Sequence, residues 1–395
     1  MLVVVAPGQG SQTPGFLTPW LEVPGFEDRL RWLSTVAGID LVRHGTQSDA
    51  ETIRDTAVAQ PLLVGAGLVS LLSLFPHPAD AYSKVSAGSG HSVGEITAAV
   101  GAGVITAEQA MVFVRERGNA MAAAAAVSPT GMTAVLGGDR DEVVAKAESH
   151  ALTAANENGA GQIVVAGTLE QLAAFAADPP ARTRLRPLQV AGAFHTEHMA
   201  PAVAVLARLA HSIYMHSARL PIISNTDGTV VHSGREVLTR LVTQVSSPVR
   251  WDLCMATMAQ MGVTAVLELP PAGILTGLTK RSLPGVETLA LTTPDDLPAA
   301  WDLIERHRTQ TVMSQAPTWR LLVAPAKGIF RLSVSSEVGD RLEPGAPVGS
   351  VVNLRDEQPV LALHGGTVVE WLVEDGDPVS PGQPIVRLHP VAASA

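Results

Sequence analysis

Short apolar runs that alternate with longer helical segments limit most strongly what this chain can fold into. Up to about residue 309, runs of strand length such as LVVVA (2–6) and VTAVLEL (263–269) alternate with segments of helical period such as residues 108–126. This alternation is typical of an α/β fold. With 395 residues, 46% of them hydrophobic and 16% charged, the chain is long enough for two or three domains with large buried cores.

The alternating units become shorter between residues 128 and 192. Their order of strand, helix, strand, strand, helix and strand predicts a small ferredoxin-like insert over 128–192. Longer units return after the insert. We therefore expect residues 1–127 and 193–309 to form one larger core.

The C-terminal part of the chain follows a different pattern. The segment TQTVMSQAPT interrupts the alternation and predicts a linker over residues 310–318. Residues 319–391 are rich in valine, glycine and proline and repeat themselves, since GDRLEPGAPV begins at Gly339 and GDPVSPGQPI begins 37 residues later at Gly376. Two quasi-equivalent β halves should pack face to face as a small all-β sandwich.

Charge and cysteine content exclude several classes of function. The net charge of −10 disfavours nucleic-acid binding. The N-terminal run MLVVVAPGQGSQ has no basic flank and is too short for a signal peptide or a membrane span, so we expect no membrane association. The single cysteine, Cys254, cannot form an internal disulfide and has no histidine cluster near it in the sequence, so we expect no metal site and a reducing, cytoplasmic location.

The segment GSGHSVGEIT (88–97) contains the candidate nucleophile, Ser92. The segment before it, YSKVSAGSG (82–90), predicts a strand, and VGEITAAVGAGV (93–104) predicts an amphipathic helix. A serine at such a strand-to-helix corner has the context of a nucleophile elbow, and the flanking glycines would let the two arms approach closely. The alternative is an ordinary turn between two glycines.

A serine hydroxyl needs a base within hydrogen-bond distance to act as a nucleophile at neutral pH. The best candidate is His195 in VAGAFHTEHM, after the predicted strand RLRPLQV. His91 adjoins Ser92, but from an elbow it should point away, and we interpret it as structural. His195 as a surface-loop histidine is the alternative that the pattern leaves open.

A set of motifs in a fixed order extends this interpretation over residues 2–308. They are APGQGSQTPG (6–15), AQPLL (59–63), GHSVGE (90–95), VRERGNAM (114–121), NENGAGQIVVAG (156–167), GAFHTEHM (192–199), QVSSPVRW (244–251) and LTGLTKR (275–281). In these motifs the chain resembles the malonyl-CoA:acyl-carrier-protein transacylases of type II fatty-acid synthesis and the related acyltransferase domains of polyketide synthases. The resemblance implies an α/β-hydrolase-like large subdomain with a ferredoxin-like small one.

The resemblance also implies a ping-pong reaction. Ser92 would attack malonyl-CoA to form a malonyl ester, with His195 as general base and acid, and the phosphopantetheine thiol of acyl carrier protein would then accept the group. The backbone N–H groups of Gln9 and Val93 would form the oxyanion hole. The main-chain carbonyl of Gln244 would orient His195, so no acidic residue completes a triad.

Further residues take substrate-binding roles by the same resemblance. Arg117 would receive the free malonyl carboxylate, which a guanidinium holds with two bonds. Phe194 would crowd the α-carbon and make methylmalonyl a poor substrate. Gln60 and Asn156 would support the pocket with polar contacts.

Acyl carrier proteins are strongly acidic, so the chain needs a local positive face to bind one. Lys280 and Arg281 are the candidates, together with Arg182, Arg184 and Arg186. Scattered solubilising charge is the alternative for each of them.

Residues 319–391 resemble a biotinyl/lipoyl carrier domain, but Arg355 stands where that family has its modified lysine, in VNLRDEQPVLALHGGTV (352–368). A guanidinium is not the amine that attachment requires, and Lys327 lies elsewhere, so we expect no prosthetic group and no cofactor. The domain is then either a stabilising or dimerising appendage, or a docking module for a biotin-dependent acyl-CoA carboxylase.

Two other activities remain open on the sequence alone. A serine thioesterase or hydrolase shares the elbow, although a lipase-like fold needs an ordered Ser–acid–His set and has its oxyanion loop after a later strand than the first. In this chain PGQGSQ follows the first strand. A polyketide-synthase-associated acyltransferase would share the chemistry and differ only in the acceptor carrier.

Overall fold

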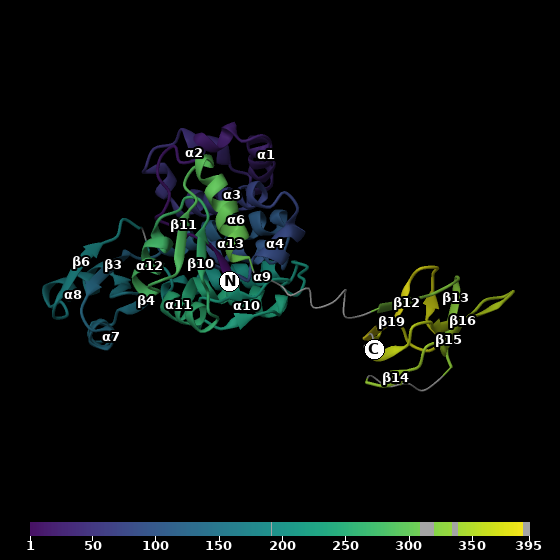
Figure 1. The fold of residues 1–395 in the computed structure, drawn as a ribbon. Coiled ribbons are helices and arrows are strands. Elements are labelled where there is room, and N and C mark those ends of the chain that lie inside the picture. Colours follow the sequence, from purple (N-terminus) through teal and green to yellow (C-terminus); the bar gives the residue numbers. More distant parts are fainter. Residues whose placement is uncertain (191, 309–319, 334–338, 390–395) are drawn as a thin grey trace. The chain divides into compact units, whose positions relative to one another are not determined.

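The computed structural model describes residues 1–190, 192–308, 320–333 and 339–389, and the fold is mixed α/β (Figure 1). The chain divides into two compact units, Met1–Thr309 and Gln310–Ala395. The predicted linker over 310–318 lies outside the described residues, as do residues 319, 334–338, 390 and 391 of the predicted β domain.

The first unit is built on a six-stranded sheet in the order β11-β10-β1-β2-β7-β8. β1 (Leu2–Ala6) lies between two parallel neighbours, β2 (Ala87–Gly90) and β10 (Ala265–Glu268), and its alternate side chains are buried in two separate core clusters. The outer strands are β11 (Glu287–Ala290), β7 (Ile222–Ile223) and the antiparallel β8 (Val230–Val231). The first apolar run of the chain therefore forms the middle of the core.

Helices surround this sheet, and the longest two pack on each other: α3 (Thr56–Leu74) and α6 (Ala107–Ala125). α6 begins with a capping box between Thr106 and Gln109. Among the described residues, α3 is the one helix long and apolar enough to cross a membrane by length and composition, and most of it is buried inside the protein. The other helices of the large body are α1 (Phe26–Ala37), α2 (Leu41–Thr46), α4 (Pro78–Lys84), α5 (Gly94–Gly101), α9 (Ala200–Ala210), α10 (Gly234–Thr243), α11 (Trp251–Gln260), α12 (Ile274–Ser282) and α13 (Leu297–His307).

A second sheet, with the order β6-β3-β5-β4-β9, follows the shorter units of the sequence. Its elements are β3 (Thr130–Gly137), α7 (Arg140–Ser149), β4 (Thr153–Gly159), β5 (Gln162–Thr168), α8 (Leu169–Ala177), β6 (Thr183–Pro187) and β9 (Val249–Arg250). β9 comes from far along the chain and pairs in parallel with β4, Asn156 opposite Val249. A strand of two residues has no periodic pattern, so the pairing of residues 249–250 with this sheet could not be predicted.

The segment that precedes Ser92, residues 82–90, is not one strand as the sequence predicted. A strand over 82–90 is wrong at its beginning, because α4 continues to Lys84 and β2 starts only at Ala87. A proline in the first turn and Asp80 near the helix N-terminus favour the helix. β2 reads AGSG and has no side-chain alternation, so its bounds are hidden in the sequence.

The second unit contains two four-stranded sheets, β12-β19-β17-β14 and β16-β15-β13-β18. All its strand pairs are antiparallel, over β12 (Arg320–Val323), β13 (Gly328–Leu332), β14 (Arg341–Leu342), β15 (Ala346–Val352), β16 (Glu357–Ala362), β17 (Gly366–Trp371), β18 (Pro378–Val379) and β19 (Pro384–His389).

The sequence repeat of this unit is also a backbone repeat. Gly339 and Gly376 have φ of 102° and 96°, and Gly345 and Gly382 have φ of 82° and 79°. These left-handed values favour glycine. Each repeat adds its short first strand to the sheet of the other half, since β14 pairs with β17 and β18 pairs with β13. Phe330, in β13, lies fully buried in the shared core.

Two glycines of α5 provide a matched test of the packing around the elbow. A Cβ atom at Gly94 would lie 2.2 Å from the carbonyl oxygen of Ala6, whereas one at Gly101 would meet only Leu71 Cδ1 at 3.4 Å. We predict that Gly94→Ala lowers the free energy of unfolding by about 3 kcal/mol through overpacking. Gly101→Ala should range from no effect to a gain of about 1 kcal/mol. Urea denaturation measures both, and equal effects would contradict this packing.

Candidate active site

The corner at Ser92 is held in a strained conformation by its surroundings. Ser92 has φ of 53°, a left-handed value that side-chain-bearing residues rarely adopt. A Cβ atom at Gly90 would lie 2.1 Å from the carbonyl carbon of Gly94, so only glycine permits the strand and helix to approach this closely. Asn225 fixes the corner, because its Oδ1 accepts from Ser92 N at 2.8 Å and its Nδ2 donates to the Gly90 carbonyl at 2.8 Å.

Ser92 and His195 form a hydrogen-bonded pair, with 2.7 Å between Ser92 Oγ and His195 Nε2. The other ring nitrogen, Nδ1, lies 2.8 Å from the main-chain carbonyl oxygen of Gln244. A carbonyl can only accept, so Nδ1 carries the proton and Nε2 is the acceptor for the serine hydroxyl. Burial, and after it the charge of Arg117, lowers the pKa of His195 to about 3, which keeps the ring neutral.

Arg117 is buried beside Ser92, with 1% of its surface exposed. Its guanidinium donates to Gln60 Oε1 at 2.7 Å, to Gln244 Oε1 at 2.9 Å and to Ser92 Oγ at 3.4 Å. No carboxylate of the described residues forms an ion pair with it, although Glu95 acts on it at longer range. Burial lowers the pKa of Arg117 to about 9, which shows how poorly its charge is compensated.

Glu95 links these groups and was not among the predicted site residues. Its buried carboxylate accepts from Gln244 Nε2 and, at 3.1 Å, from Asn225 N, while burial raises the pKa of Glu95 to about 7. Gln244 thereby joins His195, through its main chain, to Arg117, Glu95 and Asn225, which its side-chain amide contacts. Glu95 could have been identified as a site residue because it belongs to the motif GHSVGE, whereas Asn225 lies in no motif that would have pointed to it.

Two backbone N–H groups, one next to Ser92 in the chain and one in the turn after β1, have no hydrogen-bond acceptor among the described residues. They belong to Val93 and Gln9. Val93 is the N-cap of α5, where the helix dipole places positive charge. Gln9 is fixed by its side chain, which donates to the Arg54 carbonyl and to Thr56 Oγ1 at 3.2 and 3.3 Å. Such a pair of free donors is suited to stabilising an oxyanion.

A cavity of about 480 Å³ opens over Ser92 and His195. Phe194 and Asn156 line it, both mostly buried, and so does Gln60. His91 also borders the cavity, but its Nε2 lies 2.8 Å from Asn158 Oδ1 and it makes no bond to Ser92.

The remaining predicted residues lie away from the reaction centre. Lys280 and Arg281 are exposed in the last turn of α12, and Arg182, Arg184 and Arg186 are exposed on or just before the edge strand β6. Cys254 is buried, with its thiol 3.3 Å from the Ser224 carbonyl. Within the described residues no group of three or more His, Cys, Asp or Glu side chains is placed to hold a metal ion.

Comparison with known proteins assigns the first unit to a family. Residues 3–293 match the acyl transferase domain family. A malonyl CoA-acyl carrier protein transacylase from Mycobacterium tuberculosis is 49% identical over 297 residues, which cover 75% of this chain and 98% of that protein. The protein of the same name from Escherichia coli K12 is 34% identical over 307 residues, covering 76% and 98%.

Solved structures agree with these sequence relatives. The crystal structure of the transacylase from Mycobacterium tuberculosis aligns with a TM-score of 0.74 at 48% identity and covers 76% of this chain and 99% of that one. A malonyl-transacylase solved in complex with a holo acyl-carrier protein of a type II polyketide synthase aligns with a TM-score of 0.70 at 30% identity, covering 76% and 99%.

The low pKa of His195 predicts how the rate of Ser92 acylation depends on pH below neutrality. Because its pKa lies near 3, the imidazole stays neutral and able to accept a proton throughout the range from pH 5 to 6.5. We predict that the rate at which Ser92 is acylated is flat over this range, as measured by rapid quench. A loss of half the rate near pH 6.5, the ordinary imidazole value, would contradict the buried neutral base.

Titration of Glu95 near pH 7 is a separate event that the same experiment must isolate. The matched variant is Glu95→Gln, which keeps the shape and removes the ionisation. A change near pH 7 that disappears in this variant belongs to Glu95, whereas a change that persists belongs to the base.

Proposed function

The chain belongs to the acyl transferase domain family and transfers the malonyl group from malonyl-CoA to acyl carrier protein, and we propose that the transfer passes through an ester on Ser92. One observation carries the proposed route: a buried guanidinium, Arg117, lies 3.4 Å from a serine hydroxyl that is already hydrogen-bonded to a neutral imidazole. A nucleophile beside a carboxylate receptor suits an acyl group with a free carboxylate at its far end.

In the first half of the proposed reaction, His195 Nε2 takes the proton of Ser92 as the oxygen attacks the thioester carbonyl. The negative charge that develops on the carbonyl oxygen is stabilised by the N–H groups of Gln9 and Val93. The tetrahedral intermediate then collapses, the C–S bond breaks, and the imidazolium returns its proton to the departing CoA thiolate. The products are free CoA and a malonyl ester on Ser92.

In the second half of the proposed reaction the same groups catalyse the reverse type of step, with the carrier thiol as the attacking group and Ser92 as the leaving group. The phosphopantetheine thiol of the carrier gives its proton to His195 Nε2 and attacks the ester, and the released Ser92 alkoxide recovers that proton. The carbonyl of Gln244 keeps the ring in one tautomer during both halves, and it stabilises the imidazolium that forms in each.

Arg117 selects the acyl group in this proposal. Its two bonds to neutral amides hold the guanidinium in place without neutralising it, and the malonyl carboxylate supplies the missing anion. Acyl groups without a carboxylate leave the buried charge unpaired, which is unfavourable. Phe194, mostly buried in the cavity wall, limits the room beside the α-carbon and disfavours methylmalonyl.

The finer architecture of both units belongs to the same proposal. We infer an α/β-hydrolase-like core over residues 1–127 and 193–309 with a ferredoxin-like subdomain over 128–192; the sheet order β6-β3-β5-β4 supports the subdomain. The crossed halves of the second unit support a biotinyl/lipoyl-like sandwich, in which Arg355 lies in the turn between β15 and β16. Because arginine stands at this position, we propose that the second unit carries no prosthetic group. Docking of a biotin-dependent carboxylase by this unit stays a prediction.

Replacing Arg117 tests the choice of acyl group. We predict that Arg117→Ala lowers kcat/KM for malonyl-CoA by about 10²–10⁴-fold, the scale of two charge-assisted bonds at roughly 1.5–3 kcal/mol each. Arg117→Lys keeps the charge but loses the planar fork, so its kcat/KM should lie between those of the wild type and Arg117→Ala. Acetyl-CoA should become relatively better in both variants. An unchanged ratio of malonyl to acetyl transfer would remove Arg117 from the reaction, and release of malonate to water instead of transfer would favour a hydrolase.

The position of α12 generates the prediction on carrier binding. Its first turn, with Ile274 and Leu275, lines the site cavity, and its last turn presents Lys280 and Arg281 to solvent about 9 Å further along the axis. We predict that Lys280→Glu combined with Arg281→Glu raises the KM for the acidic carrier about tenfold and leaves malonyl-CoA loading unchanged.

The matched control reverses two exposed arginines on helices that do not line the cavity, Arg208 and Arg235, and so makes the same change in net charge. This control should leave the KM for the carrier unchanged. Equal losses in both half-reactions, or equal effects of the two double variants, would end the docking proposal.

A further inference from the structure

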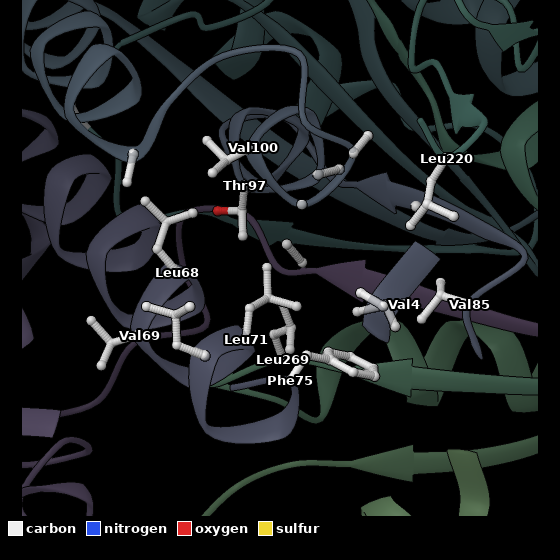
Figure 2. A pocket seen from close by; sticks show the side chains of 18 of the residues that line it. Val4, Leu68, Val69, Leu71, Phe75, Val85, Thr97, Val100, Leu220 and Leu269 are labelled. Carbon is white, nitrogen blue, oxygen red and sulfur yellow. The ribbon is translucent and has the colours of Figure 1, made fainter. Parts of the chain in front are cut away.

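A second cavity, of about 290 Å³, lies inside the first unit on one face of the central sheet (Figure 2). Its walls come from β1, β2, α3 and α5, and include Val4, Leu68, Leu71 and Phe75. No residue lines both this cavity and the one over Ser92. It is therefore a separate space behind the catalytic corner.

The walls of this cavity are almost entirely apolar. Apart from residues at its opening, the polar side chains that line it are Ser89 and Thr97, and the Ser89 hydroxyl donates to the Ile223 carbonyl at 2.9 Å. Apolar cavities exclude water and accept apolar ligands. At about 30 Å³ for each small heavy-atom group, the space holds a chain of about ten carbon atoms.

Three exposed residues mark the opening: Arg29 and Trp32 from α1, and Glu108 from α6. Arg29 and Trp32 are one turn apart and share a face of the helix. Glu108 is occupied by Trp32, whose Nε1 donates to its carboxylate at 3.2 Å. Arg29 has no ion pair among the described residues, so its guanidinium is available to an anion.

We propose that this cavity binds the aliphatic chain of a fatty acid of about ten carbons, with the carboxylate at Arg29 and the chain along Leu71 and Phe75. Binding does not depend on the reaction proposed for Ser92.

A ligand here would contact both arms of the catalytic corner. Ser89 belongs to β2, which enters the corner, and Thr97 and Ala98 belong to α5, which leaves it. Between them Gly90 and Gly94 are packed without room for even one added carbon atom. Small displacements of either arm therefore reach the backbone of Ser92 and Val93. Occupation of the cavity should slow acylation of Ser92.

The test measures binding of decanoate to the full chain by equilibrium dialysis, below the concentration at which the acid aggregates, with decanol as the uncharged analogue. Val100→Phe fills the cavity from α5, and Leu72→Phe fills it from α3 in case the first variant folds poorly. Arg29→Gln removes the charge at the opening. Arg31→Gln is the matched control, because it removes a charge from the same helix at a position that does not line the cavity.

The filling variants should weaken both ligands at least tenfold, and Arg29→Gln should weaken decanoate about tenfold while leaving decanol and malonyl-CoA loading unchanged. Arg31→Gln should change neither. Wild-type acylation should slow with decanoate, and that of the filling variants should not. Undiminished binding to the filling variants would overturn the site, and equal loss with Arg31→Gln would overturn the role of Arg29.

Enzyme whose Ser92 already carries a malonyl group separates this cavity from the active site. The malonyl-loaded protein should bind decanoate as tightly as the free protein does. If loading abolishes binding, the decanoate carboxylate lies at Arg117 and the proposal is wrong. Because dialysis does not require turnover, decanoate binding and its loss in the filling variants remain measurable even if the proposed route through Ser92 fails.

Discussion

A buried cation without a paired anion is the constraint on which the active site depends. Arg117 is held by two neutral amide oxygens, from Gln60 and Gln244, next to the nucleophile. The same charge helps to keep His195 neutral, and so able to accept a proton. Glu95 compensates part of the charge at longer range, through Gln244. In the proposed route, the malonyl carboxylate supplies the anion that the folded chain lacks.

The corner at Ser92 could be predicted from its local sequence pattern, whereas the roles of Arg117 and Gln244 followed only from the resemblance of their motifs to a family. The elbow around Ser92 and the helix after it follow from glycine spacing and helical period. The contacts that bring distant segments together could not be predicted in this way. Asn225 supports the backbone of Ser92 from a segment with no motif of its own, and β9 joins the second sheet with only two residues. Both depend on tertiary packing, which leaves no periodic pattern.

The second unit shows the same division between local and distant information. Its repeat is visible in the sequence because each half needs glycine at two left-handed positions, Gly339 and Gly345 in the first and Gly376 and Gly382 in the second. The exchange of β14 and β18 between the sheets is a long-range pairing that the repeat alone does not specify.

The malonyl ester on Ser92 is tested most directly by the mass of the intact protein after incubation with malonyl-CoA. Peptide mapping and then addition of a holo acyl carrier protein follow. A single malonyl group should appear on the peptide that contains Ser92, and it should leave that peptide when the carrier is added and appear on the carrier thiol. An unmodified Ser92, or a malonyl group that is attached elsewhere or passes only to water, would contradict the account.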